Sequence, residues 1–386
     1  MNKVLIVTSV ASMVDQFLLP NIKLIKDNGW DVEVACNFTQ GNTCDDNQIV
    51  KLKQKLSENG VKFYQIDFDR NVFNFSQNML AYKQVKRIVK TNKFDIVHCH
   101  SPIGGLITRL TCMNLRKKGT KVIYTAHGFH FFKGAPLLNW LIYFPIELIA
   151  SFLTDGVITI NTEDYNRAKK YFKTSDVFYT HGVGVDLTKF SETKENKKEI
   201  IESLNIPEEA KVIFSVGELN KNKNHKVILH AMSKIKDDNV YYLVAGEGEE
   251  KEHLLNLSKE LKVNERFKLL GYRTDISNLL GISDVFCFPS YREGLSVSLM
   301  EAMASGKPLV VSSIRGNNDL LDDGKGGYLC APFDADAFKE KIELLLNDSK
   351  LCNEFSCYNK EKIKEFSLES VKCEISEIYN FIMNKG

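Results

Sequence analysis

The sequence lacks the features that mark several classes of protein. Its formal net charge is only +2, so no global field indicates nucleic acid or another polyanion as a partner. Its nine cysteines are odd in number, scattered and never spaced as C-x-x-C. This pattern argues against a disulfide framework or a zinc site, and we therefore expect reduced thiols in a cytoplasmic protein.

Other absences concern the start of the chain. The first residues, MNKVLIVTSV, enter a strand-like apolar run without a cleavage region, so we expect no signal peptide. No G-x-G-x-x-G follows that run, which argues strongly against a nicotinamide-dependent dehydrogenase. No solenoid repeat or low-complexity tract is visible. The composition, 44% hydrophobic and 26% charged, is that of a globular protein, and 386 residues suit two domains.

Short apolar runs alternate with segments of helical period along the whole chain. This alternation predicts an α/β protein with two Rossmann-like, doubly wound domains, each built on a parallel sheet with right-handed crossovers. We expect domains at 1–185 and 186–365, a linker over Gly182–Lys198, and a C-terminal segment, 366–386, returning to the first domain. The predicted strands are Val4–Val7, Val32–Ala35, Phe63–Ile66, Ile96–Cys99, Val122–Thr125, Gly156–Ile160, Val212–Val216, Tyr241–Ala245, Phe267–Leu270, Val285–Phe288, Leu309–Val311 and Tyr328–Leu329.

The most informative stretch is FCFPSYREGLSVSLMEAMASGKPLVVSS, residues 286–313. A buried strand leads into a glycine- and serine-containing turn, and a helix is predicted to begin near Ser296–Ser298. Gly306 suits the left-handed position after the helix, and Pro308 prevents continuation. The amides of Gly294, Leu295 and Ser296 would then lie at a helix N-terminus, where free N–H groups and the positive end of the dipole favour phosphate.

The spacing of two glutamates adds a second element to this anion site. E-x7-E followed by A-x-x-x-G-x-P, with Glu293 and Glu301 as its acidic residues, resembles the motif of family-four retaining glycosyltransferases. That resemblance implies the GT-B fold, in which two Rossmann-like domains face each other across a cleft and the C-terminal one binds most of the nucleotide-sugar donor. It also implies that Glu301 binds the ribose and Glu293 the hydroxyls of the sugar.

Two further stretches resemble donor-binding segments of the same family. SVGELNKNKNH matches the family's G-R-L-x-x-x-K at Gly217 and Lys223, which implies that Lys223 binds the diphosphate. The family's arginine is replaced by Glu218, so Lys221 or Arg292 would have to substitute. The segment LLGYRTDI, which contains Tyr272, resembles the segment that meets the base.

The N-terminal half is similar to bacterial exopolysaccharide and capsule glycosyltransferases of the EpsD-like type, through DIVHCHSPIGG, KVIYTAHGFHFFKGAPLLNW and HGVGVDLTKF. The resemblance implies that His127 lies near the transferred sugar and the acceptor, with His130 a second candidate. We expect His98 in the core and His100 at a strand end that faces the cleft. The family's glycine-rich turn after the first strand is missing, since residues 8–15 read TSVASMVD.

The resemblance also implies the partners. We expect a UDP-hexose or UDP-N-acetylhexosamine donor, no metal or other cofactor, and a saccharide acceptor linked to undecaprenyl diphosphate at the inner face of the cell membrane. Phe131–Leu153 is dense in apolar residues but is interrupted by Lys133, Asn139, Pro145 and Glu147, so it cannot span a bilayer. It is either an interfacial segment that contacts the membrane or a helix of the core.

Several alternatives remain beside this hypothesis. Asp67-Phe68-Asp69 has the D-x-D spacing of metal-dependent GT-A enzymes, but we expect these residues, like Asp334 and Asp336, to be structural. A nucleotide-sugar 2-epimerase shares the GT-B architecture and would release an altered UDP-sugar without an acceptor. A non-catalytic GT-B partner subunit would keep the fold and lose the donor contacts.

Overall fold

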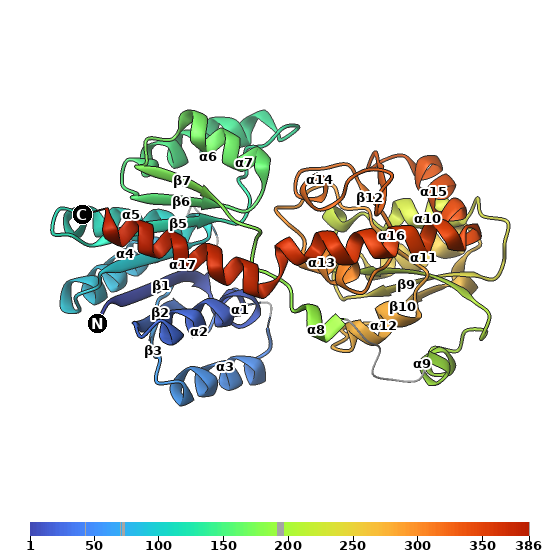
Figure 1. Cartoon of the computed structure of the whole chain (residues 1–386), viewed down its shortest axis with the longest axis horizontal. Coiled ribbons are helices and arrows are strands. Elements are labelled where there is room, and N and C mark those ends of the chain that lie inside the picture. Colours follow the sequence, from blue (N-terminus) through green and yellow to red (C-terminus); the bar gives the residue numbers. More distant parts are fainter. Residues whose placement is uncertain (43, 70, 72–73, 191–196, 386) are drawn as a thin grey trace. The chain divides into compact units, whose positions relative to one another are not determined.

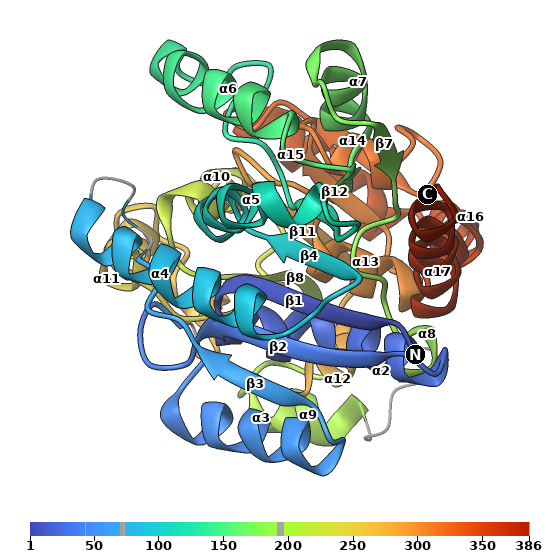
Figure 2. The ribbon, with the colours of Figure 1, turned by 90° about the vertical axis from the view of Figure 1, so that its left-hand side faces the viewer.

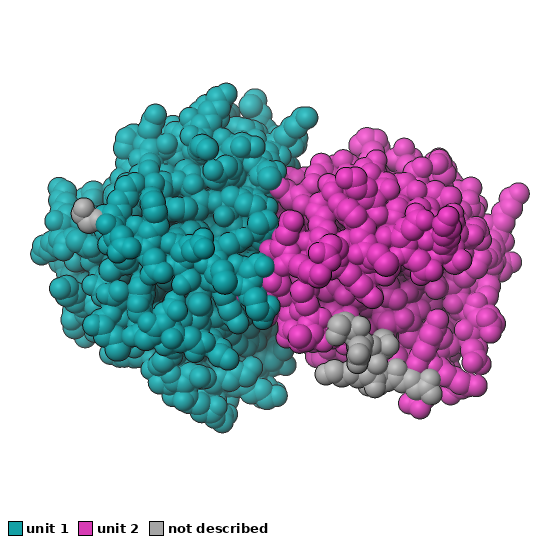
Figure 3. Space-filling model, viewed as in Figure 1, with its two compact units in different colours: residues 1–183, 369–386 teal, residues 184–368 magenta. Residues whose placement is uncertain are grey.

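The computed structural model describes residues 1–42, 44–69, 71, 74–190 and 197–385. The chain divides into two compact units, which Figure 3 colours separately: Met1–Val183 with Glu369–Gly386, and Gly184–Leu368. The boundaries expected from the sequence, 185/186 and 365/366, lie within a few residues of these limits.

The first unit is built on a fully parallel seven-stranded sheet in the order β3-β2-β1-β4-β5-β6-β7, and Figure 2 shows β3, β2, β1 and β4 side by side. Every strand predicted in this half is confirmed, whereas β7, a half-buried edge strand, was not predicted. The strands are β1 (Lys3–Val10), β2 (Asp31–Asn37), β3 (Lys62–Gln65), β4 (Ile96–His100), β5 (Lys121–Ala126), β6 (Gly156–Thr159) and β7 (Asp176–Tyr179).

Helices cover both faces of this sheet. They are α1 (Ala11–Met13), a π-helical turn (Val14–Leu18), α2 (Leu19–Asp27), α3 (Asp46–Glu58), α4 (Phe75–Thr91), α5 (Pro102–Arg116), α6 (Leu137–Ser151), α7 (Thr162–Tyr171) and α17 (Leu368–Asn384). Successive residues of a strand point to opposite faces, so Val4 and Ile6 of β1 join one core while Leu5 and Val7 join the other.

Helix α17 (Figure 1) belongs to the first of these two cores. The predicted amphipathic helix over 368–383 is confirmed, and its apolar stripe is buried against the face of the sheet that holds Val4 and Ile6. Trp30 stacks on Tyr379 of this helix with ring centroids 6.1 Å apart. The buried stripe consists of Val371, Ile375, Ile378, Tyr379 and Ile382.

Helix α6 accounts for most of the apolar segment 131–153. Its inward face is held by Glu147, whose Oε2 lies 2.9 Å from Nη1 of the fully buried Arg109 on α5. Phe131 is buried, and Trp140 and Phe144 pack half-buried on the same core. Within the described residues, no helix is both long and apolar enough to cross a membrane. The glutamate that interrupts the apolar run is therefore the residue that fixes the helix to the sheet.

The second unit repeats the architecture with a parallel six-stranded sheet in the order β10-β9-β8-β11-β12-β13. Its predicted strands are all confirmed: β8 (Lys211–Val216), β9 (Val240–Ala245), β10 (Phe267–Leu269), β11 (Val285–Phe288), β12 (Leu309–Ser312) and β13 (Gly327–Cys330). The helices are α8 (Leu187–Phe190), α9 (Lys197–Ser203), α10 (His225–Met232), α11 (Lys251–Glu260), α12 (Ile276–Ile282), α13 (Val297–Ala304), α14 (Asn317–Leu320), α15 (Ala335–Asn347) and α16 (Ser349–Lys362), with 3₁₀ turns at Lys221–Lys223, Asn264–Arg266 and Ile363–Phe366.

The packing of α17 predicts the effect of a single truncation. Ile375→Ala should lower the unfolding free energy of the first unit by about 2–5 kcal/mol, because it removes buried methyl groups and leaves a cavity. Both tryptophans of the chain, Trp30 and Trp140, lie in this unit, so tryptophan fluorescence during urea unfolding measures it selectively. The exposed neighbour variant Glu377→Ala is the control. Equal midpoints for the two variants would contradict the assignment of α17 to this core.

Candidate functional site

Each sheet reverses its strand order at one place, between β1 and β4 in the first unit and between β8 and β11 in the second. Crossover connections leave such a point in opposite directions, so a crevice opens outside the carboxyl ends of the strands, and ligands of doubly wound sheets bind there. His100 ends β4, Gly217 follows β8, and Glu293 lies in the loop after β11. These three predicted site residues therefore lie at or beside the reversal points, whereas Tyr272 follows the edge strand β10, and His127 and His130 follow β5.

The helix after β11 has the predicted local structure. Ser296 is its N-cap and accepts a hydrogen bond from the amide of Leu299 at 3.3 Å. In the described part of the chain, the amides of Gly294, Leu295 and Ser296 donate no hydrogen bond. Gly306, at φ +67°, ends the helix in the left-handed conformation, as predicted. The turn thus presents free N–H groups at the N-terminus of α13, where an anion is favoured.

Lys223 and Glu293 meet beside this turn. The Nζ of Lys223 lies 2.8 Å from Oε1 of Glu293 and 4.6 Å from the ring centroid of Phe288. Their side chains are only 19% and 15% exposed, so solvent screens the pair incompletely. A Cβ on Gly217 would lie 3.0 Å from Cε of Lys223, so the glycine gives the lysine its room. The two residues expected at the donor are therefore already in contact with each other.

Glu301 lies on α13, half-buried, and its carboxyl group makes no hydrogen bond or ion pair within the described residues. Burial raises its pKa to about 7, and the charge of Lys189 opposes this only in part. A buried carboxyl group without a partner is costly to ionise. Hydroxyl groups of a ligand could supply the missing donors.

The remaining donor-side candidates are less enclosed. Tyr272 is 66% exposed and Arg292 is also exposed, although the backbone oxygen of Arg292 accepts a hydrogen bond from Asn222. Glu218 and Lys221 are exposed as well. Arg315 was not among the predicted site residues, and its Nε donates to the backbone oxygen of Glu293 at 3.2 Å. Its place just after β12, the strand next to β11, is the signal that could have identified it.

On the first unit the structure brings three histidines together. His98 is in the core, as predicted, and its ring nitrogens lie 2.6 Å from the hydroxyl of Tyr379 and 2.7 Å from that of Thr125. His100, expected to face the cleft, is only 2% exposed. Its ring lies 4.2 Å from that of His98, and its Nδ1 lies 3.1 Å from Nε2 of His127.

Burial keeps this cluster neutral. Desolvation lowers the pKa of His98 to about 3 and that of His127 to about 4, and it lowers the pKa of His100 well below its usual value. At neutral pH the imidazole of His127 therefore has one N–H donor and one lone-pair acceptor. It can orient a hydroxyl group but provides no positive charge.

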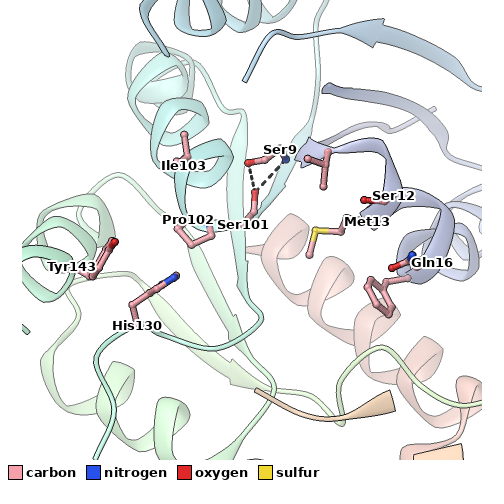
Figure 4. A pocket seen from close by; sticks show the side chains of 11 residues that line it. Ser9, Ser12, Met13, Gln16, Ser101, Pro102, Ile103, His130 and Tyr143 are labelled. Atoms are coloured by element: carbon pink, nitrogen blue, oxygen red, sulfur yellow. Dashed lines mark hydrogen bonds between the residues drawn. The ribbon is translucent and has the colours of Figure 1, made fainter. Parts of the chain in front are cut away.

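His130 lies apart from this cluster and lines a pocket of the first unit with Tyr143 of α6 (Figure 4). The rings of these two residues are stacked with centroids 4.6 Å apart. Opposite them in Figure 4 lie side chains of α1 and the π-helical turn. Strand β1 passes directly into α1, so the TSVASMVD segment forms no glycine-rich loop.

The carboxylates of the D-x-D segment are occupied by neighbouring amide groups. Asp67 accepts hydrogen bonds from Gln65 and Gln84, and Asp69 accepts them from Asn71 and Asn74. These bonds lower the pKa of Asp69. Both carboxylates are thus engaged by neighbouring side chains and amides, as the structural role expected from the sequence requires. Within the described ranges, no group of three or more His, Cys, Asp or Glu is arranged to hold a metal ion.

The two caps expected near α15 differ in outcome. Asp334 is the N-cap of α15 and accepts from the amide of Ala337 at 2.9 Å, as predicted. Asp336 lies in the first turn and instead pairs with Lys234 at 2.6 Å. Neither residue belongs to the group around Lys223 and Glu301.

Comparisons with known proteins show the family of the chain. Residues 196–362 match the family model of the glycosyl transferases group 1, and residues 3–161 match that of a glycosyl transferase 4-like domain. A Bacillus subtilis (strain 168) protein named as glycosyltransferase EpsD is 34% identical over 99% of this chain and 97% of its own. An Escherichia coli enzyme, UDP-Gal:alpha-D-GlcNAc-diphosphoundecaprenol alpha-1,3-galactosyltransferase, is 28% identical over 97% of this chain and 95% of its own.

A solved structure shows the same fold at low sequence identity. The crystal structure of Anabaena Alr3699/HepE in complex with UDP has a TM-score of 0.80 and 16% identity, covering 98% of this chain and 99% of that one. The GT-B fold class expected from the sequence is thereby confirmed.

The raised pKa of Glu301 predicts a pH-dependent stability. The folded pKa of about 7 exceeds the usual 4.5, so the unfolded chain releases this proton more readily. The resulting penalty on folding grows between about pH 4.5 and pH 7 and is constant above. Glu301→Gln should therefore stabilise the second unit at pH 8 by on the order of 1–3 kcal/mol, and much less at pH 5.

Urea unfolding followed by circular dichroism measures this difference. The tryptophan transition of the first unit should stay unchanged, which gives an internal control. The exposed residue Glu252 on α11 gives a matched variant, Glu252→Gln. A stabilisation by Glu301→Gln that is the same at both pH values would show that the carboxyl group ionises normally.

Proposed function

Because the chain belongs to the glycosyl transferases group 1 family, we propose that it is a retaining, metal-independent hexosyl- or N-acetylhexosaminyltransferase with a UDP-sugar donor. The proposal depends on one observation above all: Lys223 pairs with Glu293 at the strand reversal of the second unit, beside free amides at the start of α13, and the unpaired carboxyl group of Glu301 lies on that same helix. A nucleotide sugar offers a diphosphate, a ribose and a sugar, and this group offers a partner for each.

The diphosphate would be bound by positive charge from the protein. The amides of Gly294–Ser296 and the ammonium of Lys223 would stabilise the charge that develops on the leaving group. Arg315, which is hydrogen-bonded to the backbone of Glu293, would supply the second cation where the family's arginine is replaced by Glu218. Since these groups carry the positive charge, transfer should continue in EDTA.

The carboxylates of Glu301 and Glu293 would accept hydrogen bonds from hydroxyl groups of the donor. Glu301 would accept hydrogen bonds from the ribose, which would favour its charged form and bring its pKa back down. Glu293 would exchange part of its contact with Lys223 for hydroxyl groups of the transferred sugar. The neutral imidazole of His127 would orient the sugar and the acceptor. The reaction itself would follow the front-face displacement inferred for the family, with the leaving phosphate assisting.

The acceptor is proposed from the relatives. The Escherichia coli relative is named for a diphosphoundecaprenol-linked acceptor, and the N-terminal half of this chain resembles exopolysaccharide and capsule glycosyltransferases. We therefore expect a lipid-diphosphate-linked saccharide in surface polysaccharide synthesis, used at the inner membrane face. Product analysis separates the alternatives: a 2-epimerase releases an altered UDP-sugar without an acceptor, and a non-catalytic subunit does not bind UDP.

The outer face of α6 fits contact with that membrane. Leu137, Leu138 and Leu141 are 73%, 63% and 66% exposed, and Lys133 next to them is exposed. Most aromatic residues of the segment pack on the core, so the exposed face of α6 is aliphatic. Exposed leucines beside a cation suit the boundary between headgroups and acyl chains of anionic lipids.

Replacing the two glutamates separately tests donor binding. Glu301→Ala should weaken binding of UDP about ten- to a hundred-fold, since lost hydrogen bonds to a charged group cost about 1.5–3 kcal/mol. Glu293→Ala should keep UDP affinity and slow transfer, because its partner is the sugar. Titration calorimetry with UDP and a transfer assay in EDTA measure both effects, with Glu252→Ala as control. The assignment fails if both variants bind UDP like the parent.

A triple replacement on α6 tests the membrane contact. Leu137→Ser, Leu138→Ser and Leu141→Ser together should leave the protein folded and lower its binding to phosphatidylglycerol vesicles at least about tenfold, because each leucine loses apolar burial in the lipid. Vesicle co-sedimentation gives the measurement. The matched triple Val50→Ser, Phe75→Ser and Met79→Ser removes equally exposed apolar residues elsewhere in the unit. If both triples bind alike, α6 is not the contact.

A further inference from the structure

Three neutral imidazole rings of the first unit contact one another in sequence, from His98 through His100 to His127. Both ring nitrogens of His98 are held, by the hydroxyl of Tyr379 on α17 at 2.6 Å and by that of Thr125 on β5 at 2.7 Å. This ring therefore cannot turn without breaking a buried hydrogen bond. The ring of His100 packs on it, with centroids 4.2 Å apart and planes 32° apart. His100 is thus held in one orientation.

The hydrogen bond between His100 and His127 is well aligned. Nδ1 of His100 lies 3.1 Å from Nε2 of His127, and the ring centroids are 5.4 Å apart with planes 32° apart. The centroid distance is close to the nitrogen distance plus the two ring radii, so both nitrogens lie near the line between the rings. An N–H bond and a lone pair in these ring planes therefore point at each other. His127 is partly exposed, and its Nδ1 makes no hydrogen bond to a described residue.

Only two placements of the protons are compatible with this bond between neutral rings. Desolvation lowers the pKa of both residues, so each ring carries one N–H group at neutral pH. If Nε2 of His127 donates, both rings are protonated on Nε2; if Nδ1 of His100 donates, both are protonated on Nδ1. Because histidine in water carries its proton mainly on Nε2, the first placement keeps both rings in their preferred tautomer. It leaves a lone pair on Nδ1 of His127.

We propose that His100 is a positioning residue, which accepts the Nε2 proton of His127 and thereby presents Nδ1 of His127 as a hydrogen-bond acceptor for a ligand hydroxyl group. His100 is only 2% exposed, so it acts through His127 rather than on the ligand. The inference rests on the proposed function only in placing that hydroxyl group on the transferred sugar or the saccharide acceptor. The position of the proton can be measured without any transfer.

The bond to His100 removes two freedoms of the His127 side chain. Without this partner, the ring of His127 could turn and exchange its proton with water, so its Nδ1 would be an acceptor only part of the time. With the partner in place, a hydroxyl group meets a lone pair whose direction is fixed before the ligand arrives. That direction depends on a series of contacts that begins at Tyr379 of α17 and passes through His98 and His100.

NMR locates the proton directly. In the whole chain labelled with ¹⁵N-histidine, we expect a proton bound to Nε2 of His127, with a scalar coupling across the hydrogen bond to an unprotonated Nδ1 of His100. Nδ1 of His127 should have the shift of an unprotonated nitrogen. The signals are assigned from their loss in His127→Phe and His100→Phe. The matched control is His225→Phe, which removes a buried histidine of the second unit and should leave the pair unchanged.

Two replacements of His100 test the positioning role. His100→Asn keeps an acceptor, Oδ1, bonded to Cγ as Nδ1 of histidine is, so it should keep the proton on Nε2 of His127 and most of the transfer rate. His100→Phe keeps a ring that packs on His98 but has no acceptor. It should lower kcat about tenfold, the effect of losing one oriented hydrogen bond. Its UDP affinity should not change, because the donor group lies in the second unit. Near-UV circular dichroism checks the fold of both variants.

The outcomes separate this inference from the proposed function. A proton on Nδ1 of His100 in the parent, instead of on Nε2 of His127, overturns the inference whether or not transfer is observed. Equal losses of kcat in His100→Asn and His100→Phe, or no loss in either, also overturn it, because the rate then does not depend on an acceptor at this position. The expected spectrum in a protein that transfers no sugar supports the hydrogen-bond assignment, and the proposed function then fails alone.

Discussion

Both sheets are fully parallel, so every connection between adjacent strands must cross over one face of its sheet, and right-handed crossovers allow few arrangements. The order found in both units starts in the middle of the sheet, proceeds to one edge and then resumes on the other side of the first strand. That single reversal separates two neighbouring loops in each unit. The candidate donor group lies at the reversal of the second unit, and the pocket lined by Ser9, Ser101 and His130 lies at that of the first, although the two share no sequence motif.

Burial then determines what each crevice can bind. In the second unit, Lys223 and Glu293 neutralise each other, and desolvation leaves Glu301 close to half-ionised near neutral pH. The ionisation of Glu301 therefore responds strongly to a charged ligand. In the first unit, desolvation removes the charge from the histidine cluster, and the adjoining pocket has no charged side chain among its described lining. Hydrogen bonds and ring faces remain as the available interactions there.

Local rules made the strands and the α13 turn predictable from sequence. Most predicted strands, such as β1, β4 and β5, are apolar runs buried on both faces, although the edge strand β3 is partly exposed. The strand that was not predicted, β7, is a short, half-buried edge strand. The N-cap Ser296 and the terminating Gly306 depend on neighbours within a few residues. In contrast, Lys223 and Glu293 are 70 residues apart, and Arg315 reaches the site only because β12 pairs with β11. Composition did not decide between a membrane surface and the core for α6, because it does not reveal which side of the helix packs on the sheet.

Because α17 follows the second unit in the sequence, the ribosome makes this helix of the first unit after the second unit. One face of the first sheet, built from β1 and β2, is covered by side chains that the ribosome adds after the whole of the second unit has been made. During translation, that apolar face is not covered by α17 until residues 184–368 have been made. The second unit is continuous in sequence and can fold as soon as it is complete. The nascent N-terminal half therefore exposes part of its apolar core until α17 is made, and termination shortly before residue 369 would leave that part uncovered beside a complete second unit.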